Sequence, residues 1–271
     1  MNILCIYHKN CADGFGAALA VKKYADINKF QCEFIPAHYG DTPPDVSGKD
    51  VFIVDFSYPR ETLLELKEKA KSIKVIDHHK TAQKDLQDLD FCVFDMNYSG
   101  AVLTWETIFC TGRLPLLFKY IQDRDLWRWD MENSRAVSAG LQQLKQEFHL
   151  WERYLIAGNI PELIETGNII LQYQNKQIEK IINSEVQLTN IAGHYVPCIN
   201  TTTLISEIGN ELAKGEPFCA MYFETADKRI YSLRSDSNGI DVSGIAKKFG
   251  GGGHFHAAGF SVDKPPVNLS I

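Results

Sequence analysis

The stretch Lys74–Thr81, KVIDHHKT, places one carboxylate and two adjacent imidazoles directly after a short β-branched run. Val75 and Ile76 favour extended backbone, so Ile73–Ile76 is predicted to be a buried strand. Two adjacent histidines have no packing reason to follow such a strand. The stretch therefore indicates a buried sheet whose strands carry metal-ligating side chains at their carboxyl ends.

Apolar runs and helical patterns alternate along residues 1–130 around this stretch. The apolar runs predict strands at Asn2–Tyr7, Cys32–Pro36, Val51–Asp55, Ile73–Ile76 and Phe91–Phe94. The segments between and after them predict helices at Gly14–Lys29, Arg60–Lys71 and Ala101–Thr111. Such strands separated by helices predict an α/β fold with a doubly wound parallel sheet that is covered on both faces.

A long helix is predicted to join this sheet to a second domain. Residues 114–157 show a mostly helical pattern, and Ile160–Ile182 carries its apolar residues along one helical stripe. Beyond this helix, shorter elements predict a smaller mixed α/β domain, with strands at Gln187–Ile191, Tyr195–Asn200, Phe218–Phe223 and Arg229–Leu233, and helices at Leu204–Lys214 and Val242–Phe249. We therefore predict a catalytic domain at 1–157, a connector helix at 158–188 and a second domain at 189–271, with a cleft between the two domains.

The composition is that of an ordinary globular protein. The 271 residues are 45% hydrophobic and 23% charged, and this length suits two domains. The net charge of −6 gives no basic field to gather long nucleic acid, so long duplex DNA is not expected as a substrate. The seven scattered cysteines lack CxxC spacing, which favours reduced thiols and a cytoplasmic location. Neither a signal peptide nor a bilayer-long apolar run is apparent, so no membrane contact is expected. The sequence leaves the oligomeric state open, and an oligomer is possible.

Polar side chains follow three of the predicted strands, at the edge where parallel strands end together. Taken alone, each strand-end acid is more often a turn or cap residue, but the whole set predicts a shared metal site. The candidates are His8, Asp13, Asp55, Asp77, His78 and His79, together with Asp123 in YIQDRDLW, for which Asp125 is the alternative. Mixed Asp/His ligands suit Mn²⁺ or a similar divalent ion, and a carboxylate such as Asp55 can bridge two ions about 3.5–4 Å apart.

These motifs resemble those of the DHH phosphoesterase family. VIDHH is preceded by VDFS and by a histidine followed by Asp-Gly, in the order typical of that family. The segment YSLRSDSNGIDVSGIAKKFGGGGHFHAAGF is similar to the C-terminal domain associated with it, whose hallmark is GGGH followed by A-x-G. The weaker INTTTLISEIGNEL also fits that domain. The resemblance spans nearly the whole chain.

The resemblance implies a set of metal ligands and their neighbours. The implied ligands are His8, Asp13, Asp55, His78 and Asp123, while Asp77 and His79 act beside them, with His79 on the phosphate. The implied cofactor is Mn²⁺, as one or two ions, with Mg²⁺ or Co²⁺ as alternatives. Many members carry Asp-x-Asp in the first motif, whereas this chain has Cys11-Ala12-Asp13. We expect a neutral Cys11 beside the site, although a thiolate could bind a soft ion, and the number of ions stays open.

The glycine run Gly250–Gly253 predicts a place where backbone N–H groups approach an anion. A flexible helix terminus is the alternative for a bare run. Arg234 offers a planar fork for a phosphate. The predicted substrate-binding residues of the second domain are therefore Arg234, Ser235, Gly251, Gly252, Gly253 and His254.

We expect a Mn²⁺-dependent hydrolase, a phosphoesterase that cleaves phosphodiester bonds of short oligonucleotides or small nucleotides, as nano-RNases do. Cyclic dinucleotides or nucleoside bisphosphates are the alternative substrates within the same class. A pyrophosphatase or polyphosphatase is disfavoured by the GGGH motif. A nucleotide-binding sensor with weakened catalysis is the hypothesis from another class, and Cys11 in place of an aspartate is the feature that favours it.

Overall fold

The computed structural model describes residues 1–110, 113–184 and 186–264, so the last residue of the predicted helix Ala101–Thr111 and the end of the predicted second domain lie outside the described residues. The chain divides into two compact units, Met1–Leu171 and Gln172–Ile271. The division lies inside α8 (Ile160–Ile182), the helix predicted to connect the domains. The three-part domain division stays a prediction.

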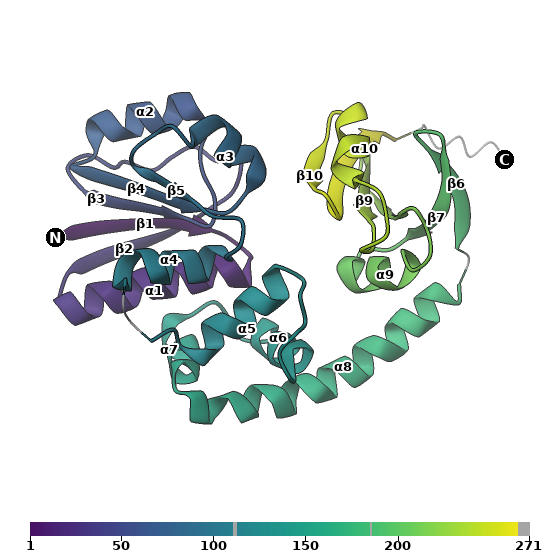
Figure 1. The fold of residues 1–271 in the computed structure, drawn as a ribbon, viewed down its shortest axis with the longest axis horizontal. Coiled ribbons are helices and arrows are strands. Elements are labelled where there is room, and N and C mark those ends of the chain that lie inside the picture. Colours follow the sequence, from purple (N-terminus) through teal and green to yellow (C-terminus); the bar gives the residue numbers. More distant parts are fainter. Residues whose placement is uncertain (111–112, 185, 265–271) are drawn as a thin grey trace. The chain divides into compact units, whose positions relative to one another are not determined.

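The first unit is built on a parallel sheet of five strands. Its order is β2-β1-β3-β4-β5, and every neighbouring pair runs parallel (Figure 1). Strands β2 and β3 therefore lie on opposite sides of β1, and this reversal of strand order puts a topological switch point between β1 and β3. The strands are β1 (Asn2–His8), β2 (Gln31–Ala37), β3 (Asp50–Val54), β4 (Ser72–Asp77) and β5 (Cys92–Phe94).

Helices cover both faces of this sheet, which confirms the predicted doubly wound fold. In Figure 1, α1 (Ala12–Asn28) and α4 (Gly100–Phe109) lie on one face and α2 (Arg60–Lys69) and α3 (Lys80–Leu86) on the other. Successive residues of β1 are accordingly buried in two separate hydrophobic clusters. Helix α3 was not predicted, because its seven residues bury only one apolar side chain and give no helical stripe.

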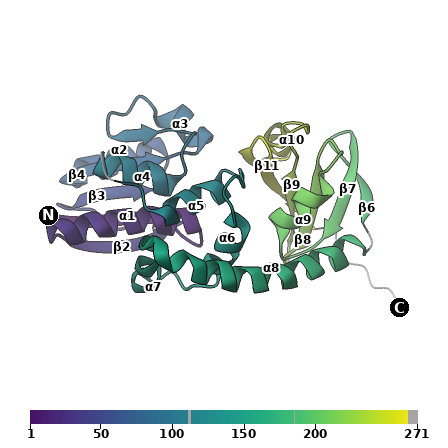
Figure 2. The same cartoon turned by 60° about the horizontal axis from the view of Figure 1, so that its bottom comes forward.

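Further helices pack beside the first part of α8. These are α5 (Leu116–Asp125), α6 (Ser134–Gln142) and α7 (Phe148–Glu152), followed by the 3₁₀ turns η1 (Arg153–Leu155) and η2 (Ala157–Asn159). Figure 2 shows α6 beside α8, and a Cβ atom at Gly167 would lie only 1.8 Å from the Ala136 carbonyl oxygen. The close helix crossing therefore requires glycine. Among the described helices, none combines the length and apolar character of a membrane span.

The second unit contains a mixed sheet, as predicted. Its order is β10-β11-β9-β8-β7-β6, with β7 and β8 parallel and the other pairs antiparallel. The elements are β6 (Gln187–Ile191), β7 (His194–Asn200), α9 (Ile205–Leu212), β8 (Cys219–Glu224), β9 (Lys228–Arg234), α10 (Val242–Lys248), β10 (Gly252–His254) and β11 (Ala257–Asp263). Strands β10 and β11 were not predicted, because glycine and alanine give a weak strand signal. The end of the glycine run is thus strand rather than loop.

Candidate metal centre

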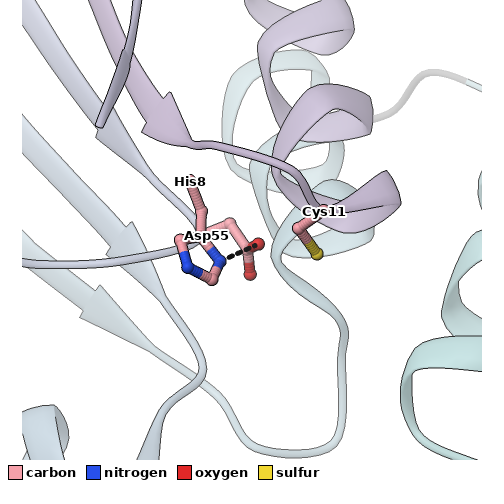
Figure 3. A group of neighbouring side chains, drawn as sticks. All are labelled: His8, Cys11 and Asp55. Atoms are coloured by element: carbon pink, nitrogen blue, oxygen red, sulfur yellow. Dashed lines mark ion pairs between the residues drawn. The ribbon is translucent and has the colours of Figure 1, made fainter. Parts of the chain in front are cut away.

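The side chains of the candidate centre meet where β1, β3 and β4 end. His8 closes β1, Cys11 is the residue before α1, and Asp55 and His78 directly follow β3 and β4. Figure 3 shows His8, Cys11 and Asp55 pointing toward one another from three different segments. The centre therefore lies at the switch point between β1 and β3, where ligands of doubly wound sheets bind.

Asp55 is the central acid of this group. The residue is 1% exposed, and its backbone adopts a left-handed φ of 62° while its N–H donates to the Ile76 carbonyl oxygen at 2.9 Å. This conformation is uncommon outside glycine but tolerated by aspartate. Oδ2 lies 3.6 Å from His8 Nδ1, and Oδ1 lies 3.2 Å from His78 Nε2. The two carboxylate oxygens thus face two different imidazoles.

The N-terminus of α4 holds Asp13 in place. Oδ2 of Asp13 accepts from the N–H of Gly100 at 2.5 Å, and Oδ1 accepts from the N–H of Ala101 at 3.0 Å. These N–H groups have no acceptor within the helix and lie at the positive end of its dipole, so they favour a carboxylate. A Cβ atom at Gly100 would lie 2.4 Å from Asp55 Oδ1, so glycine also makes room for the central acid. The helix begins one residue before the predicted start at Ala101, after the N-cap residue Ser99, and its contact with Asp13 was not predicted.

The charges of the group are strongly coupled. Burial raises the pKa of Asp13, and the negative charges of Asp55 and Asp125 raise it further. Burial lowers the pKa of His78, but its contact with Asp55 and the charges of Asp13 and Asp125 outweigh that effect and raise the pKa to about 10. For Asp55, burial is outweighed by its contacts with His78 and His8, which hold its pKa below the usual range. The carboxylates are thus balanced by protons that a divalent cation can replace.

The structure gives Asp123 and Asp125 different contacts, while the choice between them as a metal ligand stays a prediction. Asp123 Oδ1 accepts from the N–H of Asp130 at 3.0 Å and Oδ2 accepts from the N–H of Met131 at 3.2 Å, so this carboxylate ties down the chain after α5. Asp125 Oδ2 lies 3.6 Å from His78 Nε2. Positions two residues apart on a helix point about 200° apart, and only one of the two can face the centre.

Asp77 orients its neighbours instead of joining the group of candidate ligands. It is completely buried, and its Oδ1 lies 2.6 Å from His79 Nδ1 and accepts from the N–H of His78 at 2.8 Å. The hydrogen bond between Asp77 Oδ1 and His79 Nδ1 fixes the plane of the His79 ring. A catalytic role for Asp77 and His79 stays a prediction.

The residues fit a divalent metal ion. Three overlapping groups each have their ligand atoms within 4.8 Å of one another: His8, Cys11 and Asp55; Asp55, His78 and His79; Asp13, His78 and Asp125. Within the described residues, the buried Oδ1 of Asp55 makes no hydrogen bond of regular geometry. A buried carboxylate oxygen that faces an imidazole without a regular hydrogen bond is suited to binding a cation. The acids and histidines could therefore bind a metal, and the number of ions stays open.

Arg234 and Ser235, two predicted substrate-binding residues of the second unit, form hydrogen bonds within the protein. Arg234 ends β9, where its guanidinium donates to Ser206 Oγ at 3.1 Å and to the Leu233 carbonyl oxygen at 2.8 Å. Ser235 Oγ lies 3.0 Å from Nδ1 of His256, a histidine that sequence analysis did not consider. The signal for His256 was its position two residues after the GGGH motif.

Packing against β11 accounts for two glycines of the run. A Cβ atom at Gly251 would lie 2.1 Å from the Gly259 carbonyl oxygen, and one at Gly253 would lie 2.5 Å from the Ala257 carbonyl oxygen. Gly253 also has a left-handed φ of 143°. Open space surrounds the Cβ position of Gly252. Substrate binding by Gly251, Gly252, Gly253 and His254 stays a prediction.

Asn substitutions distinguish Asp125 from Asp123. Asp125→Asn should weaken Mn²⁺ binding by about 10–100-fold and leave the metal-free protein as stable as before, because it removes a candidate ligand among like charges. Asp123→Asn should instead lower the free energy of unfolding by about 1–3 kcal/mol, because one of the two backbone N–H groups that donate to this buried carboxylate loses its acceptor. Calorimetric Mn²⁺ titration and thermal unfolding of the metal-free variants measure both effects. The reverse pattern would restore Asp123 as the ligand.

The comparisons identify the second unit and two relatives of the whole chain. A family model described as the DHHA1 domain matches residues 191–269. The chain is 31% identical over 287 residues to the uncharacterized R106 protein of Acanthamoeba polyphaga mimivirus, covering 94% of this chain and 66% of that protein's length. It is 24% identical over 305 residues to the oligoribonuclease NrnB of Bacillus subtilis, covering 98% of this chain and 74% of NrnB.

Three solved structures share the fold. An exopolyphosphatase-related protein from Bacteroides fragilis has a TM-score of 0.61 at 14% identity, over 96% of this chain and 86% of that one. The pGpG-specific phosphodiesterase PggH from Vibrio cholerae has a TM-score of 0.56 at 13% identity, over 97% and 94%. RecJ from Thermus thermophilus has a TM-score of 0.52 at 14% identity, over 97% of this chain and 49% of RecJ. With its DHHA1 domain and its VIDHH motif at the centre of the site, the chain belongs to the DHH phosphoesterase family.

Proposed function

We propose that the protein is a metal-dependent phosphodiesterase that hydrolyses short oligonucleotides or small nucleotides. The observation that carries this proposal is the position of Asp55, whose two oxygens face His8 on one side and His78 on the other. One buried carboxylate between two groups of ligands suits a pair of divalent ions, the arrangement used in phosphoester cleavage.

Each side chain of the centre has a role in this proposal. Divalent ions bound there would activate water and offset the charge of the phosphate. Asp13 keeps its orientation through the N–H groups at the start of α4, and Asp55 keeps its orientation through Gly100 and its left-handed φ. Asp77 fixes the His79 ring, and we assign His79 to a phosphate oxygen in the transition state.

Mn²⁺ is the proposed ion, with Mg²⁺ and Co²⁺ as alternatives. Carboxylates with imidazoles are a ligand set that suits Mn²⁺. The RecJ structure with the same fold was determined in complex with Mn²⁺, which supports this choice. We place the reaction in the cytoplasm, since all seven cysteines are free.

Short substrates are proposed for three reasons. The net charge of −6 disfavours long nucleic acid. NrnB is an oligoribonuclease and PggH is a pGpG-specific phosphodiesterase, so two similar proteins act on short RNA or on a dinucleotide. In the second unit, Arg234, Ser235, the glycines Gly251–Gly253 and His254 are proposed to bind the part of the substrate that does not react. Cyclic dinucleotides and nucleoside bisphosphates are the alternative substrates.

A nucleotide sensor is the second candidate function, and it is favoured by Cys11 at a position where many family members have an acid. Incubation with Mn²⁺ and a 5′-labelled dinucleotide separates the two functions. Binding without turnover, at any metal concentration, would favour the sensor.

His78→Ala should abolish turnover. Wild-type protein stripped with EDTA should hydrolyse labelled dinucleotides and short oligoribonucleotides only after Mn²⁺ is added. The variant should lose more than about 100-fold in kcat with its circular dichroism unchanged, because the His78 ring contacts Asp13, Asp55 and Asp125. His149→Ala is the matched control, since this histidine is exposed and contacts only Glu147 among the described acids. Equal activity of the two variants would overturn the proposed centre.

Arg234→Ala should raise KM for the dinucleotide and leave kcat nearly unchanged, because a residue that binds the non-reacting part adds uniform binding energy. Arg229→Ala on the same strand is the control, since that guanidinium pairs with Glu224. Steady-state kinetics over the substrate panel measure both variants. Wild-type KM values for Arg234→Ala would refute a substrate-binding role for the second unit.

A further inference from the structure

We propose that Cys11 is a metal ligand, and that one side of the centre, formed by His8, Cys11 and Asp55, prefers thiophilic divalent ions such as Co²⁺ or Zn²⁺ over Mn²⁺. The inference rests on the metal-dependent function proposed above and adds to it the identity of one ligand and the class of ion. It also replaces the expectation that Cys11 is a neutral bystander.

The three ligand atoms are close enough to share one ion. The Sγ of Cys11, a ring nitrogen of His8 and a carboxylate oxygen of Asp55 all lie within 4.8 Å of one another. An ion bound at about 2.0–2.3 Å from each donor spans donors up to about 4.6 Å apart. The group can therefore close around one ion through shifts of tenths of an ångström. Figure 3 shows the three side chains converging from the end of β1, the start of α1 and the end of β3.

A second observation is that Asp55, which the two sides share, has an oxygen available to a cation beside His78. Asp55 is 1% exposed, and its Oδ1 makes no regular hydrogen bond within the described residues, although buried carboxylate oxygens are almost always paired. Its other oxygen, Oδ2, faces His8 at 3.6 Å. Asp55 can thus offer one oxygen to the side with Cys11 and one to the side with His78.

Backbone hydrogen bonds hold Cys11 in its position. The Cys11 carbonyl oxygen accepts from the Phe15 N–H at 3.1 Å and from Gln146 Nε2 at 3.0 Å, which anchors the residue. Cys11 occupies the N-cap of α1, where Ser, Thr, Asn or Asp would normally bond to the first turn, yet its side chain makes no capping hydrogen bond. The thiol is therefore held beside the centre, and within the described residues it makes no capping hydrogen bond.

The two sides of the centre differ in donor chemistry. Asp13, His78 and Asp125 offer only oxygen and nitrogen, which suit Mn²⁺ or Mg²⁺. The side with Cys11 adds sulfur, which binds Co²⁺ and Zn²⁺ far better than hard ions. Binding of such an ion by the thiolate releases the thiol proton to solvent.

Co²⁺ absorption spectroscopy tests the assignment directly. The chelator-stripped full-length protein is titrated with Co²⁺ alone, because the visible d–d bands report occupancy while a near-ultraviolet charge-transfer band reports a thiolate–cobalt bond. Wild type is compared with Cys11→Ser and Cys11→Asp, and Cys110→Ser serves as the control because Cys110 is exposed and lies outside the three candidate groups. Circular dichroism checks that each variant is folded.

Wild type and Cys110→Ser should show both kinds of band. Cys11→Ser should lose the charge-transfer band, keep d–d absorption and bind Co²⁺ about 10-fold or more weakly, with Mn²⁺ affinity unchanged. Cys11→Asp should lose the band and favour Mn²⁺, and it carries the comparison if the serine variant does not fold. Wild-type d–d bands without the charge-transfer band would overturn the cysteine ligand while leaving the phosphodiesterase standing. Wild type that binds neither ion would overturn both proposals.

Discussion

The first unit depends on bringing three carboxylates together at one edge of a parallel sheet. Asp13, Asp55 and Asp125 share the environment of His78, and like charges in a poorly solvated place repel strongly. Two features offset this repulsion: the imidazoles beside the acids, and the N–H groups at the start of α4 that bind Asp13. A divalent cation would offset it more completely, and this is the physical basis of the proposed metal-dependent function.

The fold supplies this arrangement through its topology. The strand order puts the ends of β1 and β3 beside each other, and their last polar residues, His8 and Asp55, therefore meet. Local backbone features then refine the geometry: a left-handed φ turns Asp55 into the centre, and Gly100 leaves room for its oxygen. Cys11 enters the same place from the start of α1. The chemistry of the centre is thus decided by a few residues at strand and helix ends, on a scaffold of ordinary buried strands.

Hydrophobic pattern was sufficient to predict the scaffold and much of the centre. The inner strands β1, β3 and β4 are mostly buried and therefore read as apolar runs, and the meeting of His8, Asp55 and His78 followed because parallel strands end at one edge. The pattern could not separate the two acids at the end of α5, since it does not say which side of a helix end faces a site. The bond from Asp13 to the N–H of Gly100 joins residues 87 positions apart, and no local signal encodes such a contact.

The central claim is that Asp55 joins two groups of ligands around bound ions. Anomalous diffraction from crystals soaked in Mn²⁺ tests it most directly, because the ions themselves are located. We expect anomalous density within coordination distance of Asp55, with His78 and Asp125 on one side of it and His8 on the other. Anomalous density away from Asp55, or a fully soaked crystal with none at the ends of β1, β3 and β4, would contradict the account.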